Sequence, residues 1–175
     1  MELTPELVVP RLRGSFGRDY RWTPETASTQ RMLPPDAPHG AVALAEHQTE
    51  GRGRLGRVWV DEPRTGLTFS IALHPRPPVA RWPELTLVAA RAVAAAVGPE
   101  AEIKEPNDVL VGGRKVAGIL AEAGERVVVG IGVNVGASPW EGAGAVDADR
   151  LELLLSILEL LERGYDAWLA SVTGS

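Results

Sequence analysis

The stretch AEIKEPNDVLVGGRKVAGILAEAGERVVVGI, residues 101–131, predicts a run of neighbouring antiparallel strands. The pair Gly112-Gly113 separates the apolar run 109–111 from a second run over 115–122, which is the pattern of a two-residue hairpin. Gly124-Glu125 marks the next turn, before a third strand. This meander indicates a sheet with antiparallel pairing at the centre of the fold.

Segments on either side of this stretch predict further strands and two long helices. Trp82–Val97 is rich in Ala and Leu and ends at Gly98-Pro99, so we expect a helix buried against the sheet. Leucines recur at helical spacing over 149–169. Apolar runs of strand length lie at 41–46 and 66–73, and 19–23 predicts a short strand with Tyr20 and Trp22 on one face. Residues 1–19 read as an irregular lead-in. Interleaved strands and helices with an antiparallel meander favour an α+β fold with a mixed sheet and flanking helices.

The composition indicates one globular domain over residues 1–175, with hydrophobic residues making up 45% of the chain. The absence of cysteine excludes disulfides, thiolate metal sites and a cysteine nucleophile. A net charge of -5 without a long basic run argues against nucleic-acid binding. No apolar stretch approaches the roughly 20 residues that span a bilayer, and the N-terminus does not resemble a signal peptide. We therefore expect a soluble cytoplasmic protein.

The segment Gly51-Arg52-Gly53-Arg54-Leu55-Gly56-Arg57 is a loop that concentrates positive charge. Closely spaced arginines repel one another unless anions neutralise them, and glycines let a backbone approach a ligand. These features suit a cradle for phosphate or carboxylate, and a solvated basic loop explains them equally well. The segment matches neither the Walker pattern nor the glycine-rich turn of a dinucleotide fold.

A second polar segment is Lys104-Glu105-Pro106-Asn107-Asp108, which suits a turn at the end of a strand. Lys115 differs, because it opens the apolar run 116–120, where a charge needs a reason. Strict alternation would place Lys115 and Gly118 on opposite faces of the sheet unless a bulge intervenes, and a strand glycine commonly marks a bulge or a close ligand approach. A plain edge lysine is the other interpretation.

Taken in order, four blocks of the sequence resemble motifs of the biotin–protein ligase family. They are ETASTQ (25–30), QTEGRGRLGRVW (48–59), KEPND (104–108) with RKVAGIL (114–120), and GIGVN (130–134). The resemblance covers about residues 20 to 170 and is most specific in the glycine–arginine block with its flanking Gln and Trp. It implies a mixed sheet with flanking helices, similar to the catalytic core of class II aminoacyl-tRNA synthetases.

The resemblance also implies the activity. Members use ATP to activate biotin as biotinyl-5′-AMP and transfer it to a lysine of a biotin carboxyl carrier protein, a subunit of acetyl-CoA carboxylase. Mg²⁺ accompanies the nucleotide, and members often pair as homodimers through a sheet. A lipoate–protein ligase of the same superfamily and a non-catalytic sensor of biotin or its adenylate are the alternatives.

The resemblance assigns roles to individual residues. Around biotin it places Ser28, Thr29, Gln48, Gly51, Arg52, Lys115, Gly118 and Gly130. Around the nucleotide it places Arg54, Trp59, Lys104, Asn107, Gly132 and Asn134, with Asn107 and Asn134 also serving Mg²⁺. The catalytic cations would be Arg52, Arg54, Lys104 and Lys115.

The sequence departs from the family pattern in several places. Glu105 stands where the family normally has Trp, and strand alternation would turn it away from Lys104. Gln30 replaces a common Asn. We find neither an N-terminal DNA-binding domain nor the small C-terminal β-domain, so we expect a catalytic domain alone. Asp108 is the candidate for a general base in the transfer step. We expect Trp22, Trp82, Trp140 and Trp168 to be packing residues, and the three histidines to have no catalytic or metal role.

Overall fold

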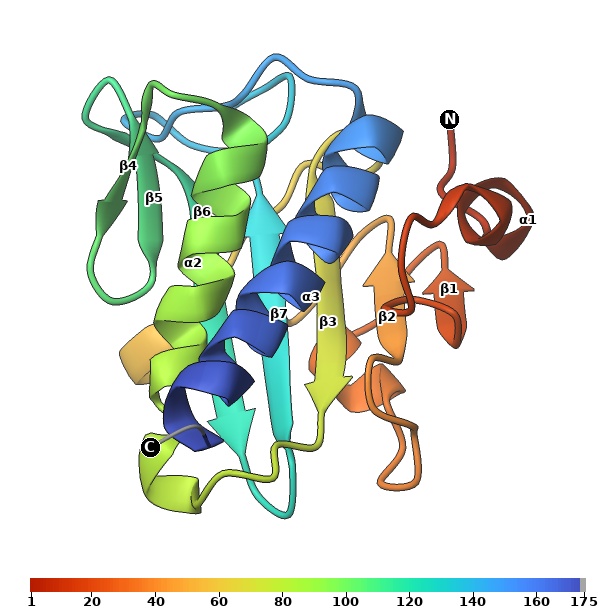
Figure 1. Ribbon diagram of the computed structural model, residues 1–175. Coiled ribbons are helices and arrows are strands. Elements are labelled where there is room, and N and C mark those ends of the chain that lie inside the picture. Colours follow the sequence, from red (N-terminus) through yellow and green to blue (C-terminus); the bar gives the residue numbers. More distant parts are fainter. Residues whose placement is uncertain (174–175) are drawn as a thin grey trace.

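A seven-stranded sheet in the order β1-β2-β3-β7-β6-β5-β4 forms the centre of the computed structural model, which describes residues 1–173 (Figure 1). β1 runs parallel to β2, and all other neighbours are antiparallel. The strands are β1 (Tyr20–Thr23), β2 (Val42–Ala45), β3 (Leu67–Leu73), β4 (Ala101–Lys104), β5 (Asp108–Val111), β6 (Arg114–Ala123) and β7 (Val127–Val133). The predicted mixed sheet and its meander are confirmed.

Two long helices, α2 (Glu84–Val97) and α3 (Arg150–Thr173), lie side by side on one face of the sheet (Figure 1). Both predicted helices are thus confirmed, and the leucine stripe of α3 is buried in the core. The lead-in predicted as irregular instead contains α1 (Pro5–Val8) and a 3-10 turn, Val9–Arg11. A proline at the first helical position explains the start of α1, because that residue needs no hydrogen-bonded N–H. Within residues 1–173, no helix combines the length and apolar character needed to cross a bilayer.

The two faces of the central strands carry different side chains. Phe69, Ile131 and Ile119 stand opposite one another on β3, β7 and β6, and all are buried. One residue further along, Ser70, Gly130 and Leu120 form the next row across the same strands. Because successive residues of a strand point to opposite faces, the bulky row packs toward α2 and α3. The row with smaller side chains leaves room on the other face.

A bulge in β6 changes which residues share a face. Val109 pairs with Ala117, but the next residue of β5, Leu110, pairs with Lys115, so β6 has one extra residue at Val116. An extra residue reverses the alternation on either side of it. Lys115 and Gly118 therefore lie on the same face of the sheet. Strict alternation would have placed them on opposite faces, and the bulge is what changes this.

The buried carboxylate of Glu46 joins β2 to β1, the N-terminal segment and α3. It accepts hydrogen bonds from the backbone N–H of Leu3 and the indole of Trp22, each at 2.8 Å, and from Arg150 at 2.6 Å. Arg150 also donates to the carbonyl oxygens of Gly66 and Met1. Burial by itself would raise the pKa of Glu46, but the hydrogen bonds outweigh it and leave the pKa below its ordinary value.

Candidate active site

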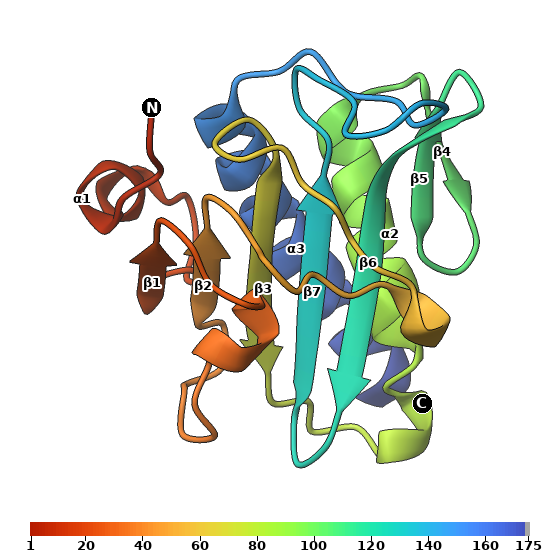
Figure 2. The ribbon, with the colours of Figure 1, turned by 180° about the vertical axis from the view of Figure 1, so that it is seen from behind.

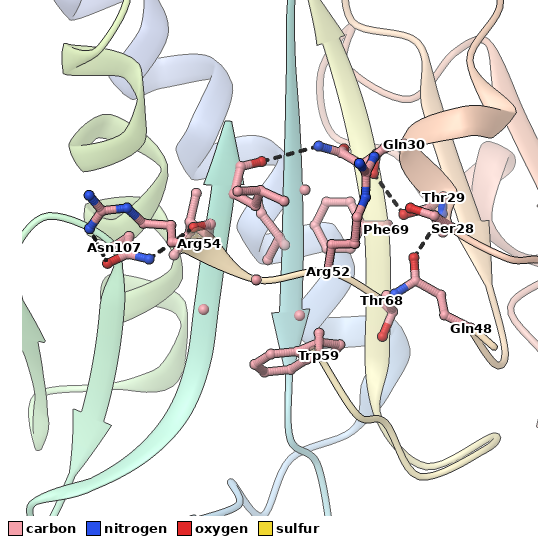
Figure 3. A pocket seen from close by; sticks show the side chains of 18 of the residues that line it. Ser28, Thr29, Gln30, Gln48, Arg52, Arg54, Trp59, Thr68, Phe69 and Asn107 are labelled. Atoms are coloured by element: carbon pink, nitrogen blue, oxygen red, sulfur yellow. Dashed lines mark hydrogen bonds between the residues drawn. The ribbon is translucent and has the colours of Figure 1, made fainter. Parts of the chain in front are cut away.

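Figure 2 shows the face of the sheet that α2 and α3 leave uncovered. A cavity lies on this face. Its floor consists of two short rows across β3, β7 and β6, Thr68–Gly132–Gly118 and Ser70–Gly130–Leu120. The other side chains around it come from η2 (Thr29–Met32), the segment between β2 and β3, and Asn107 and Lys115 (Figure 3).

The glycines of the floor are needed for space. A Cβ at Gly132 would lie 2.4 Å from the Trp59 ring, and one at Gly130 would lie 3.0 Å from the side-chain oxygen of Gln30. At Gly118 the nearest atoms belong to Lys115 and Trp59, at 3.2 Å and 3.3 Å. A side chain at Gly132 would displace Trp59, whereas one at Gly130 or Gly118 would make the neighbouring side chains shift by a few tenths of an ångström.

The arginine loop, residues 51–59, crosses the sheet above this floor (Figure 2). Two backbone hydrogen bonds fold it back on itself, from Gly53 to Arg57 at 2.7 Å and from Trp59 to Gly51 at 2.9 Å. The turn passes through η3 (Arg54–Gly56), where Leu55 and Gly56 have positive φ. The loop therefore has a defined shape in which the arginine side chains reach outward to other elements.

Two of these arginines contact the sheet. Arg54 donates to the side-chain oxygen of Asn107 at 3.3 Å, and Arg52 pairs with Glu122 at 3.1 Å (Figure 3 shows the former). Asn107 in turn donates to the carbonyl oxygen of Ile119 at 3.3 Å. These contacts hold the arginine loop over the cavity from two sides.

Lys115 brings a positive charge to the cavity beside Trp59. Its Nζ lies 5.7 Å from the centroid of the Trp59 ring and 3.0 Å from a carboxylate oxygen of Asp108. That oxygen is buried, and the ion pair with Lys115 is the contact that compensates its charge. The Trp59 N–H is buried without a partner among residues 1–173.

The opposite end of the cavity is polar and uncharged. The backbone N–H of Thr29 donates to the side-chain oxygen of Gln48 at 2.7 Å, and the hydroxyls of Thr29 and Ser70 lie 2.7 Å apart. Ser28 is buried beside them. Asp61 braces this end by accepting from the Gln48 backbone at 3.0 Å and contacting Nδ1 of His47 at 2.6 Å. Hydroxyl and amide groups at these positions suit a small, polar, uncharged ligand group.

A second, larger cavity adjoins the first. The two share Gly53, Arg54, Trp59, Asn107 and Lys115 as a common wall. The second cavity is otherwise lined by Leu55, Arg57, Val58, Lys104, Glu105, Asp108 and Trp140. Four basic side chains from this lining and the common wall, Arg54, Arg57, Lys104 and Lys115, can therefore act on one anionic ligand.

Two expectations about this second cavity are wrong. Glu105 does not turn away from Lys104, because the chain bends after β4 and both residues line the cavity. Trp140 is not an interior packing residue, because it is 42% exposed and meets the Trp59 ring edge-on, with 6.3 Å between centroids. Its position in a loop rich in Gly, Ala and Pro, rather than in an apolar run, is the signal that could have separated it from the other tryptophans.

Most of the residues expected around the ligands do line a cavity. Ser28, Thr29, Gln48, Arg52, Arg54, Trp59, Asn107, Lys115, Gly118, Gly130 and Gly132 line the first, and Lys104 lines only the second. Gly51 and Asn134 line neither. Gly51 holds the loop through its carbonyl, and the buried Asn134 amide donates to the carbonyl oxygen of Gly144 at 3.0 Å. Thr68, Ser70 and Gln30 also line the first cavity, although no sequence pattern had marked them as site residues.

Known proteins are similar to this chain in sequence. A biotin--[acetyl-CoA-carboxylase] ligase of Mycobacterium tuberculosis is 41% identical over 155 residues, covering 81% of this chain and 57% of the relative. A bifunctional ligase/repressor BirA of Bacillus spizizenii is 43% identical over 110 residues, covering 57% of this chain and 34% of the relative. The chain thus spans little more than half of the length of one curated relative and about a third of the other.

Solved structures that resemble this chain belong to the same kind of protein as the sequence relatives. The biotin protein ligase of Aquifex aeolicus in complex with biotin and ATP superposes with a TM-score of 0.72 at 32% identity, covering 86% of this chain and 72% of that chain. The family model for biotin/lipoate A/B protein ligases matches residues 19–136, which include both polar segments, the arginine loop and the glycine floor. The chain therefore belongs to the biotin/lipoate A/B protein ligase family.

Proposed function

We propose that this chain condenses biotin with ATP to biotinyl-5′-AMP and transfers the biotinyl group to a lysine of a biotin carboxyl carrier protein. The observation that carries the proposal is the common wall, where Arg54 and Lys115 face two adjoining cavities at once. Relatives named as ligases for acetyl-CoA carboxylase, and a neighbour with biotin and ATP bound, support this assignment of substrates.

In the proposed first step, the biotin carboxylate attacks the α-phosphorus of ATP and pyrophosphate leaves. Both reactants are anions, and the transition state spreads further negative charge over the phosphate oxygens. Arg54 and Lys115 at the common wall, with Lys104 in the second cavity, would offset that charge in a partly desolvated site. Adjacent cavities also hold the reacting groups together, which reduces the entropic part of the barrier.

Each end of the first cavity would bind a different part of biotin. The hydroxyl and amide groups of Ser28, Thr29 and Gln48 suit the uncharged ureido ring. The glycine floor at Gly118, Gly130 and Gly132 leaves room for the ring and its aliphatic tail. The tail then directs the carboxylate toward Lys115. Trp59 and Trp140 offer aromatic faces to the base of the nucleotide in the second cavity.

In the second step, the carrier lysine amine attacks the acyl carbon of biotinyl-5′-AMP, and AMP leaves. The attacking amine must lose a proton. Asp108 is the candidate base, because its carboxylate lines the second cavity. One of its oxygens is buried and paired with Lys115 at 3.0 Å, so Lys115 would have to turn to the phosphates before Asp108 could accept the proton.

Mg²⁺ fits one of the two asparagines proposed for it. Asn107 lines both cavities and would help hold a Mg²⁺ that arrives with the nucleotide phosphates. Asn134 does not fit, because its amide is buried against backbone carbonyls and lines neither cavity. The ion would neutralise phosphate charge. Residues 1–173 contain no cluster of three acidic or histidine side chains able to bind a metal.

Release of pyrophosphate tests the proposal. The purified chain with ATP should release it when biotin is added, and not when lipoate is added. Biotin should then appear on a carrier domain. Release with lipoate alone would establish the lipoate–protein ligase. Binding of biotin without release would establish a sensor, and in that case Glu105 in the second cavity would be the first residue to replace.

A further inference from the structure

The carboxylate of Glu122, on β6, holds two segments that come from different parts of the chain. Arg52 of the arginine loop donates to its Oε1 at 3.1 Å, and the Gln30 amide donates to the same oxygen at 3.0 Å. Glu122 itself does not line the first cavity, whereas Arg52 and Gln30 do. The carboxylate therefore acts on the cavity only through its two partners.

Gln30, one of the two partners of Glu122, and Trp59 of the arginine loop cover two glycines of the cavity floor. Gln30 stands over Gly130 and also reaches the carbonyl oxygens of Leu120 and Val128 at 3.3 Å and 3.4 Å. Trp59 stands over Gly132, two residues further along β7. The arginine loop is thus fastened to β6 by Glu122 and lies against Gly132 through Trp59.

We propose that Glu122 is a positioning residue that keeps the arginine loop closed over the acyl-adenylate and so limits its hydrolysis. This inference rests on the proposed function. In hydrolysis, water adds to the acyl carbon of biotinyl-5′-AMP, and biotin and AMP are released. A closed loop slows this reaction by excluding water.

The exposure of the pair suits a contact that opens and closes. The side chains of Arg52 and Glu122 are 44% and 42% exposed, and such pairs contribute little to folding stability. A substrate can therefore displace the contact during a turnover without unfolding the protein. The loop should reclose by the same contact once the adenylate has formed.

Limited proteolysis of the ligand-free full chain tests the closure directly. Trypsin cleaves after arginine, and the arginine loop contains Arg54 and Arg57. In Glu122→Gln the uncharged amide holds Arg52 less tightly, so cleavage at these sites should accelerate roughly threefold, as expected from an exposed ion pair. Glu125→Gln makes the same charge change on the next turn, where the carboxylate forms no ion pair within residues 1–173, and should cleave as the parent does.

Retention of the adenylate gives the second measurement. With biotin and ATP but no carrier, Glu122→Gln should release AMP about three times faster than the parent, while the rate of adenylate formation stays within a factor of two. Glu122→Asp keeps the charge and should recover part of the retention. A thermal unfolding scan shows whether each variant is folded.

The outcomes separate the two proposals. If the parent makes no adenylate, the proposed function is wrong, and the tryptic rates alone decide whether Glu122 closes the loop. If the parent makes adenylate but Glu122→Gln matches it in both measurements, the role of Glu122 is wrong and the ligase function stands. Equal acceleration in Glu125→Gln would also overturn the role, because the effect would then come from net charge.

Discussion

Gly132 lies where the indole of Trp59 meets the sheet, and no larger side chain fits there. We predict that Gly132→Ala lowers biotin-dependent pyrophosphate release at least tenfold, because the new methyl displaces a ring that forms the wall of both cavities. Overpacking of this kind typically costs about 1–3 kcal/mol. Steady-state kinetics with both substrates measures the effect.

Gly124→Ala is the matched control for that variant. No atom lies within 4 Å of a Cβ at Gly124, on the turn between β6 and β7. Its kinetics should equal those of the parent. Unchanged turnover in Gly132→Ala would show that Trp59 moves away from the floor without consequence, contrary to the proposed site.

Lys115 belongs to the common wall, where the biotin carboxylate is expected to meet the nucleotide phosphates. We predict that Lys115→Gln reduces the rate of adenylate formation about a hundredfold, the usual cost of removing one charge-stabilising group. Pre-steady-state measurement of biotinyl-5′-AMP isolates this step. Lys104→Gln, which affects only the second cavity, should raise KM for ATP more than KM for biotin. An identical pattern in both variants would contradict the separate placement of biotin and nucleotide.

At the residue scale, most of the residues that sequence and resemblance singled out line one of the two cavities. Motif positions such as Arg54 and Lys115 can be identified because their charge stands out against glycine or apolar neighbours. Ser70 and Thr68 could not be identified, because a hydroxyl in an apolar strand looks the same whether it faces a cavity or a helix. Their role follows only from the register of β3 against β7.

At the scale of elements, the meander and the long helices were predictable from hydrophobic periodicity. The bulge at Val116 was not, because an extra residue in a strand leaves no mark in composition. Yet the bulge determines the site, since it places Lys115 on the face of Gly118. The order of the strands in the sheet could not be predicted either, because β3 pairs with β7, which is far from it in the sequence.

The contacts of Glu46 hold β1, β2, the N-terminal segment and α3 together, so replacing this residue should destabilise the fold. We expect Glu46→Gln to lower the free energy of unfolding by roughly 3–5 kcal/mol at pH 7, because the change leaves Arg150 buried without its anion. Urea denaturation measures this difference. Arg163→Gln is the control, since its pair with Glu159 lies on the exposed surface of α3.

The Glu46 carboxylate should also make the stability of the fold depend on pH. The pKa of Glu46 is lower in the folded chain than its ordinary value, because hydrogen bonds from Trp22, Arg150 and Leu3 outweigh the effect of burial. The Glu46 carboxylate contributes fully to the free energy of unfolding well above about pH 4.3. This contribution is lost as the pH falls through the pKa of Glu46 in the folded chain. The gap in stability between parent and Glu46→Gln should therefore narrow on acidification, and a constant gap down to pH 3 would contradict the assignment.

At the scale of the whole molecule, the first cavity lies on the sheet face away from α2 and α3 and the second adjoins it, while the main hydrophobic core lies between the sheet and these helices. Ligands that bind only the folded chain should stabilise it by about 2.7 kcal/mol at a concentration one hundred times Kd. For a domain of this size, that predicts a rise in Tm of roughly 5–10 °C with biotin and a non-hydrolysable ATP analogue. Arg54→Gln, which weakens the common wall, should reduce the rise.

The common wall has a thermodynamic consequence for the order in which ligands bind. Trp59 belongs to both cavities, so a ligand that fixes its ring in one cavity prepares the surface that the other ligand meets. Such heterotropic cooperativity is reciprocal by linkage. Whatever factor biotin adds to the affinity for a nucleotide analogue, the analogue must add to the affinity for biotin, and replacing Trp59 should bring both factors toward one together.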